Sequence, residues 1–349
     1  MHWTSRSRPF HIALLLGALS LLIMLGELGP HAFMAGLALA VVPVPAYVIL
    51  ALWLDRFEPE PVRMLATTFL WGASVAVFLS LVINSLVAGL ADAMLGGMGD
   101  QLAALLAAPL VEEAAKGLAL LLVFLQARDE FDNVTDGVIY AAMVGLGFAM
   151  TENVLYYGRA IAELPGDPWP VFLRRGLASP FAHPLFTAMT GIGLGMARER
   201  SRGGRELLFL PLVGFLVAVM LHAAWNLSAL LDRFAPTYLL VMVPIFAGTL
   251  LVVRDSLRRE SQVIRDQLAH LCGSGALTTD ELAALCSVRG RLEATLRAAR
   301  HEGLSGWRRR SRFQRAATEI AFHRWRTARD GTEQRPAADE EQELRAARR

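Results

Sequence analysis

The chain has 349 residues, 54% of them hydrophobic, and its formal net charge at pH 7 is only +2. Its mean hydropathy of +0.41 is too high for an ordinary soluble domain of this length, so the composition favours a membrane protein. Residues 10–253 are mostly apolar with short charged connectors, whereas residues 254–349 are rich in arginine, glutamate and aspartate. The two cysteines, Cys272 and Cys286, lie in the charged part without a metal-binding pattern, and we expect free thiols.

The apolar part contains a series of segments long enough to cross a bilayer, which requires roughly 20 mainly apolar residues. Residues 11–26 are followed by no small-residue cleavage site, so they are interpreted as a first transmembrane helix and not as a signal peptide. The sequence thus predicts an all-α, polytopic transmembrane helix bundle of about eight spans. In chain order they are residues 10–26, 31–54, 64–90, 101–126, 134–158, 180–197, 206–231 and 236–253.

Arginine bias between the connectors predicts the orientation. Eight spans place both termini on one side, and nine arginines lie in the connectors of that side against four on the other. The first group is Arg6, Arg8, Arg56, Arg63, Arg128, Arg198, Arg200, Arg202 and Arg205, and the second is Arg159, Arg174, Arg175 and Arg233. We therefore expect a multi-pass protein of the plasma (inner) membrane with both termini in the cytoplasm.

Residues 1–253 are thus expected to form the transmembrane domain, and residues 254–349 a cytosolic helical tail. Thr278 and Glu281 have the spacing of a capping box, and two or three amphipathic helices are expected between about residues 260 and 329. The arginines from Arg308 to Arg312, with Trp307 and Phe313, either contact anionic lipid or lie on a solvated helix, which is the simpler interpretation. The last 20 or so residues, 330–349, are expected to be disordered.

Lys116 is the only lysine of the chain, and it lies in an apolar segment together with Glu112 and Glu113. A charge at a bilayer centre costs about 2.5–3.5 kcal/mol or more, and such residues usually face a bundle interior and serve a function. The lysine follows the two glutamates at the i,i+4 and i,i+3 spacings, so its ammonium group can reach either carboxylate. Pro109 suits the first turn of this helical segment.

The few other polar residues of interest inside the predicted spans fall at similar depths. With a rise of 1.5 Å per residue, they and Glu112 lie between about 5 and 17 Å from the predicted outer ends. They are Glu152 and Asn153 in the fifth span, His183 in the sixth, and His222 and Asn226 in the seventh. Asp136 falls at the opposite, cytoplasmic end and is not expected to join them. The shared depth predicts one polar site in the outer half of the membrane.

Carboxylates beside a lysine and histidines fit general-base catalysis on water. Glu112 or Glu113 would accept a proton from water. His222 and Asn226 would bind the carbonyl oxygen as it becomes an oxyanion. His183 would donate a proton to the leaving amine or bind a metal. Structural roles stay open: a neutralising Glu–Lys pair, an interhelical His–Asn clamp, a surface Glu152–Asn153 pair, or an interfacial histidine.

Over residues 102–231 the motifs resemble the PrsW family of intramembrane proteases. They are Glu112-Glu113-x-x-Lys116, Asp136-Gly137-x-x-Tyr140, Gly147-Phe148-Ala149-x-x-Glu152-Asn153, His183 and His222-x-x-x-Asn226. The chain is also similar, more distantly, to the CAAX prenyl endopeptidases and the bacterial CPBP proteins. Their Phe-x-x-x-His position reads Phe148-x-x-x-Glu152 here, and His183 is the candidate for the missing histidine's role.

The resemblance implies a polytopic protease that cleaves a single-pass membrane protein, such as an anti-sigma factor, outside the cytoplasm. Family members are often described as metalloproteases, whereas the CAAX relatives are described as glutamate-dependent. A divalent metal such as zinc would have His183, His222 and Glu152 as ligands by their spacing. We favour the glutamate mechanism without a cofactor, because no His-Glu-x-x-His motif is present.

Two other classes of function remain alternatives. Intramembrane Glu, Lys and His also form proton relays, so a proton-coupled transporter is possible, although no internal repeat supports it. A non-catalytic scaffold that binds membrane peptides would tolerate Glu112→Gln, whereas a protease would not. Expected partners are the lipid bilayer and the single-pass substrate, and no nucleic acid.

Overall fold

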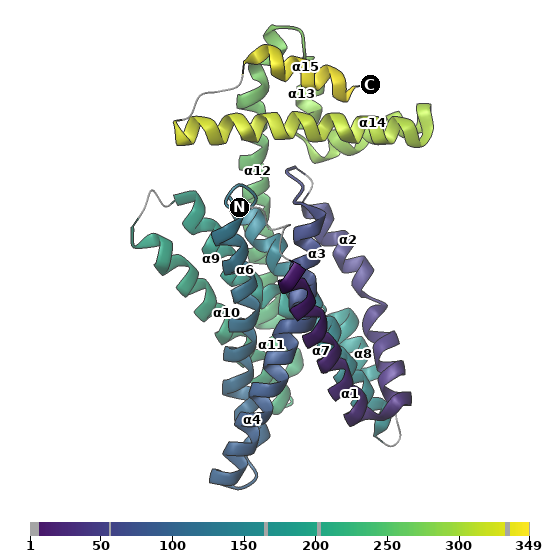
Figure 1. Cartoon of the computed structure of the whole chain (residues 1–349), viewed down its shortest axis with the longest axis vertical. Helices are drawn as coiled ribbons and strands as arrows, with labels where there is room; N and C mark the ends of the chain where they lie inside the picture. The colour runs from purple at the N-terminus through teal and green to yellow at the C-terminus, as the bar shows by residue number, and fades with distance from the viewer. Residues whose placement is uncertain (1–6, 56, 164–166, 201–203, 332–335, 349) are drawn as a thin grey trace. The chain divides into compact units, whose positions relative to one another are not determined.

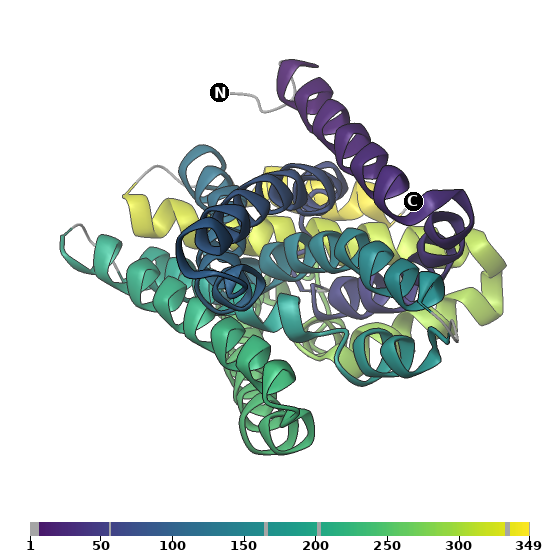
Figure 2. The same cartoon turned by 90° about the horizontal axis from the view of Figure 1, so that it is seen from below.

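The computed structural model describes residues 7–55, 57–163, 167–200, 204–331 and 336–348, and within these ranges the secondary structure is helical, without strands. The chain forms two compact units (Figures 1 and 2). The first comprises Met1–Leu54 and Glu60–Val253, and the second comprises Asp55–Pro59 and Arg254–Arg349. The predicted all-α polytopic fold is confirmed.

Five helical segments are long and apolar enough to cross a membrane. They are Phe10–Leu54, Val62–Leu95, Val134–Ala162, Glu206–Leu230 and Phe234–Gly273. Helices α6 (Ala108–Gln126) and α9 (Ala182–Arg200) coincide with two further predicted spans, but each carries three charged residues and neither is among the five. The count of eight spans therefore stays a prediction.

The first unit begins with α1 (Ser7–Val41) and α2 (Val44–Leu54). The break expected between residues 26 and 31 occurs inside α1 at Gly29, whose φ of 72° is favourable only for glycine, next to Pro30. Figure 1 shows the purple chain reversing its direction there. The remaining helical elements are α3 (Val62–Trp71), η2 (Gly72–Ala76), α4 (Val77–Leu95), α5 (Gly99–Leu102), η3 (Ala103–Ala107), α6, α7 (Val134–Ala162), α8 (Trp169–Phe172), η4 (Leu173–Ala178), α9, α10 (Glu206–Leu230), α11 (Phe234–Thr237), η5 (Tyr238–Met242) and α12 (Val243–Gly273), where η denotes a π-helical turn.

Helix α7 lies at the centre of this unit, against α9, α1 and α3. It begins with a capping box, in which Asn133 accepts from the backbone of Thr135 and Asp136, and Asp136 accepts from Asn133 N at 3.0 Å. Its glycines bring neighbouring backbones very close: a Cβ at Gly137 would lie 2.2 Å from the Gly191 carbonyl oxygen of α9. This close packing aligns the polar faces of α7 and α9.

A short segment before α9 departs from the sequence prediction. Residues 159–179 were expected to be a connector, but Trp169–Ala178 is helical as α8 and η4. Two tyrosine hydroxyls bind carbonyl oxygens near its end: Tyr47 donates to Gly176 O at 3.2 Å and Tyr238 to Ala178 O at 2.7 Å. Such polar capping satisfies irregular backbone inside an apolar environment.

The second unit contains the end of α12, α13 (Thr279–Leu285), α14 (Val288–Asp330) and α15 (Ala337–Ala347). The Thr278–Glu281 capping box forms as its spacing indicates. The expected disorder of residues 330–349 is wrong for Ala337–Ala347. Glu340 of α15 is buried there against Arg324 at 3.1 Å and His270 at 3.1 Å, and Leu344 is also buried, so an apolar and an ionic contact hold this helix.

Candidate active site

The site is built around Lys116, which is completely buried in α6. Its ammonium nitrogen Nζ lies 2.8 Å from Glu113 Oε1 and 3.5 Å from Glu112 Oε2. It also lies 3.0 Å from His183 Nδ1 and 3.8 Å from the centroid of the Phe148 ring. One cation therefore contacts two carboxylates, as the helical spacing of Glu112, Glu113 and Lys116 predicted, and it also contacts an imidazole and an aromatic face.

Glu113 uses both carboxylate oxygens within the protein. Oε1 accepts from Lys116 and lies 3.0 Å from His222 Nδ1, and Oε2 accepts from the Thr187 hydroxyl at 3.1 Å. The side chain is fully buried. Because a carboxylate at Nδ1 is best satisfied by an N–H donor, this contact favours the His222 tautomer that carries its proton on Nδ1.

Glu112 is placed differently. Its Oε2 is buried without a hydrogen bond, 3.7 Å from His222 Nε2, while Oε1 accepts from Asn84 Nδ2 at 3.5 Å. Of the two glutamates, Glu112 lines a cavity of about 400 Å³ between α4, η3, α7 and the end of α10, and Glu152 lines it as well. A buried polar atom without a hydrogen bond is rare and needs an explanation, and a catalytic role is one.

On the other side of Lys116, His183 lies between the lysine and a third carboxylate, that of Glu152. His183 Nε2 lies 3.0 Å from Glu152 Oε2, and Glu152 also pairs with Arg175 of η4. Arg175 donates to Asn153 Oδ1 at 2.6 Å, and its guanidinium group stacks on the Tyr156 ring at 3.7 Å. Glu152 is thus tied to both the histidine and the short helical segment before α9.

The remaining predicted residues are less central. Asn153 accepts a hydrogen bond from Arg175, which in turn pairs with Glu152. Asn226 lines the cavity but donates to Ala104 O at 2.8 Å. Asp136 lies at the start of α7, four helical turns before Glu152, and its carboxylate caps that helix. This agrees with the expectation that Asp136 lies outside the site.

Three residues that contact the carboxylates of Glu112, Glu113 and Glu152 were not identified from the sequence. Thr187 looks like any small polar residue of a membrane helix, and Asn84 is an isolated amide in an apolar stretch. Arg175 was assigned to a connector. The available signal was the run of apolar residues around two arginines at residues 169–178, which is too short for a span but suits a half-length helix.

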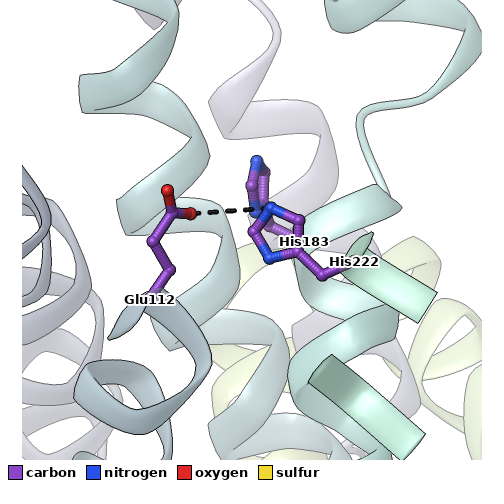
Figure 3. A group of neighbouring side chains, drawn as sticks. All are labelled: Glu112, His183 and His222. Atoms are coloured by element: carbon purple, nitrogen blue, oxygen red, sulfur yellow. Dashed lines mark ion pairs between the residues drawn. The ribbon is translucent and has the colours of Figure 1, made fainter. Parts of the chain in front are cut away.

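The donor set of the cluster fits a divalent metal ion. Glu112, His183 and His222 each offer one atom, all within 4.8 Å of one another, and Figure 3 shows the carboxylate of Glu112 facing the two rings. One carboxylate and two imidazoles match the ligands of catalytic zinc sites. The hydrogen-bond-free Oε2 of Glu112 also suits a ligand atom. The group differs from the predicted set because Glu112, and not Glu152, completes it.

Known proteins resemble the chain over this region. The family described as "PrsW family intramembrane metalloprotease" matches residues 60–249, which include every residue of the cluster. The Protease PrsW of Geobacillus kaustophilus is 30% identical over 172 residues, 49% of this chain and 69% of the relative. Those of Clostridioides difficile and Bacillus subtilis are 28% and 31% identical, over 59% and 49% of this chain and 84% and 72% of the relatives. No solved structure matches the chain.

The family matches more than half of the chain, and its matched region coincides with the helices that hold the buried cluster. The resemblance expected from the motifs is thereby confirmed. A polytopic helical bundle with a buried acidic and histidine cluster is also compatible with hydrolysis inside a membrane. The chain belongs to the PrsW family of intramembrane proteases.

Proposed function

We propose that the chain hydrolyses a peptide bond in a single-pass membrane protein, an anti-sigma factor being the candidate class, with water activated by Glu112. The observation that carries this proposal is the different surroundings of the two glutamates. Both carboxylate oxygens of Glu113 accept hydrogen bonds from the protein. Glu112, in contrast, lines the cavity, and its Oε2 has no hydrogen bond. Only a carboxylate that meets the cavity can take a proton from a water there.

His222 would assist the same water. With its proton on Nδ1 toward Glu113, the ring presents the lone pair of Nε2 at 3.7 Å from Glu112 Oε2. A water held between these two atoms can donate one hydrogen bond to each. Glu112 accepts the proton as the water oxygen bonds to the carbonyl carbon, and Glu113 holds the imidazole in the required tautomer.

Lys116 and His183 would serve the later stage of the reaction. The oxyanion that forms at the carbonyl oxygen is stabilised by the buried positive charge of Lys116, which needs no rearrangement to act. The carbon–nitrogen bond then breaks and the amine nitrogen takes a proton. His183, between Lys116 and Glu152, is the donor that we assign, and Glu112 passes to His183 the proton that it took from water, so that both residues return to their starting protonation states.

A metal-dependent variant of this mechanism is favoured by one observation, the grouping of Glu112, His183 and His222. A divalent ion such as zinc, when bound by these residues, would polarise the carbonyl group and acidify water. Lys116 opposes a second cation in this place, since its Nζ lies 3.0 Å from His183 Nδ1. We therefore favour the glutamate mechanism, with Lys116 as the resident positive charge.

The arginine bias of the connectors and the depths of the site residues support an outer-half site in the plasma membrane, with both termini in the cytoplasm. Cleavage there would release the extracytoplasmic part of the substrate. This orientation also leaves the charged second unit in the cytosol.

The test uses purified full-length protein in liposomes with co-reconstituted, tagged single-pass membrane proteins from the same cell. Glu112→Gln is expected to abolish cleavage because the amide cannot accept the proton, while Glu206→Gln at the exposed start of α10 retains it. Full cleavage by Glu112→Gln would overturn the assignment. Treatment with a chelator distinguishes the two mechanisms: unchanged activity supports the glutamate form, and loss restored by zinc supports the metal form.

A further inference from the structure

The second unit exposes four large apolar side chains that its own core does not need. Leu292, Leu296, Leu304 and Trp307 of α14 are 52%, 38%, 76% and 46% exposed, and we call these four residues the apolar tip. The core of the unit is filled by other side chains of the same helix, including Phe313 and Ile320, which are 2% exposed. The apolar tip is therefore available for a partner.

The tip is held rigidly. Gly303 has a φ of 64° and interrupts α14, so that the two arms fold back on each other. Arg291 of the first arm donates to the Thr318 hydroxyl at 2.7 Å, and Gln314 of the second arm donates to Arg291 O at 3.0 Å. A Cβ at Gly306 would lie 2.4 Å from Ala298 O, which shows how closely the arms approach. The apolar side chains are thus presented on a preformed hairpin.

Positive charge surrounds the tip. Between Val288 and Asp330 the chain contains twelve arginines against three glutamates and one aspartate. Exposed arginines lie on both arms close to the apolar residues: Arg297, Arg300, Arg308 and Arg312. Arginines beside leucine and tryptophan are the pattern of helices that bind at membrane interfaces, and basic residues near an anionic surface strengthen such binding.

The second unit is joined in sequence to helices that are candidate membrane spans. Helix α12 runs from a candidate membrane span into the second unit, and residues 55–59 of that unit join α2 to α3. Arg291 donates to Phe57 O at 3.3 Å, and Arg326 pairs with Glu58 at 2.9 Å. The hairpin is thus attached to a segment between two apolar helices. A second copy of this hairpin would be repelled by its like charge, and a nucleic acid would leave the leucines without apolar contacts.

We propose that the apolar tip of α14 binds the anionic surface of the membrane in which the first unit is embedded. Leu304 and Trp307, with Leu292 and Leu296, enter the interfacial layer. Arg297, Arg300, Arg308 and Arg312 contact lipid phosphates. This binding is independent of the proposed catalysis and needs no substrate.

The test places an environment-sensitive fluorophore on Leu304→Cys in full-length protein that also carries Cys272→Ser and Cys286→Ala. The protein is reconstituted in nanodiscs of phosphatidylcholine alone or with phosphatidylglycerol. In the anionic discs we expect a blue shift of the emission and quenching by spin-labelled lipid. The same label on Gln342→Cys, an exposed polar position of α15, should show neither effect.

Further variants separate the contributions of charge and apolar contact. Arg308→Gln with Arg312→Gln should reduce the shift, as should high salt, and inorganic phosphate added to the phosphatidylcholine discs should not reproduce it. Unchanged, unquenched emission of the Leu304 label in anionic discs would overturn the proposal. Protection of the label only when soluble cell extract is added would assign the tip to a protein partner instead and equally overturn it.

Discussion

Lys116 shows how one buried cation organises the site. Its charge lies between Glu112 and Glu113, and it also contacts His183 and the Phe148 ring, so four groups from three helices depend on it. A compact ammonium group contacts partners in several directions, whereas a guanidinium group is a planar fork that needs more room. This explains why a chain otherwise rich in arginine has a lysine here.

Replacement of Lys116 by methionine should strongly destabilise the first unit. The substitution leaves Glu113 fully buried without its counter-ion, which costs about 3–5 kcal/mol. We expect a clear fall in the midpoint of thermal unfolding in detergent, partly reversed by adding Glu113→Gln. The control is Arg159→Ala, which breaks only the exposed pair with Glu27 at 2.7 Å and should change stability by less than about 1 kcal/mol. Equal effects of both substitutions would contradict the central role of Lys116.

The sequence identified the ionisable residues of the site that lie inside predicted spans and missed Thr187, Asn84 and Arg175. Glu112, Glu113, His183 and His222 stand out because charge and imidazole are rare in apolar helices. Thr187 does not stand out, and its contact with Glu113 depends on how α9 is rotated about its axis. In a helix that is apolar on nearly all sides, periodicity does not determine this rotation.

At the scale of the elements, close helix packing sets the geometry of the site. Gly137 of α7 and Gly191 of α9 meet backbone to backbone, so Glu152 on one helix and His183 on the other come within hydrogen-bonding distance. The sequence predicted these helices from their length and hydropathy. It did not predict α8 and η4, because a helical segment of ten residues is shorter than a span and was interpreted as a connector.

Gly137→Ala should separate α7 from α9. The added Cβ would lie 2.2 Å from the Gly191 carbonyl oxygen, a clash that backbone shifts relieve at a cost of about 1–3 kcal/mol or more. We expect lower thermal stability and reduced proteolytic activity together. Gly89→Ala in α4 is the matched control, because no atom lies within 4 Å of its added Cβ. A Gly137→Ala protein as stable as the control would argue against this packing.

At the scale of the whole molecule, the chain combines an apolar unit that holds the site with a charged helical unit. The charged unit includes residues 55–59, which are far from it in sequence. Composition alone separated residues 254–349 but could not reveal that Phe57 and Glu58 join them, because these contacts depend on the three-dimensional path of α14.

Arg291→Gln should loosen the second unit while the first stays intact. The buried guanidinium group donates to Leu285 O and to Thr318, both at 2.7 Å, and hydrogen bonds of charged groups contribute about 1.5–3 kcal/mol each. Limited proteolysis should then remove residues after about 254 faster than in the unchanged protein. Arg289→Gln, which affects an exposed pair with Glu293, should leave the rate unchanged. Identical rates for the two variants would contradict the structural role of Arg291.

The central claim, that Glu112 drives proteolysis of a membrane-anchored protein, is tested most directly in cells. Membrane proteomes are compared between cells that contain the unchanged chain and cells with Glu112→Gln at equal abundance. The mechanism predicts that at least one single-pass protein loses its extracytoplasmic part only with the unchanged chain, and accumulates at full length with the variant. Identical membrane proteomes, with every single-pass protein processed equally, would contradict it.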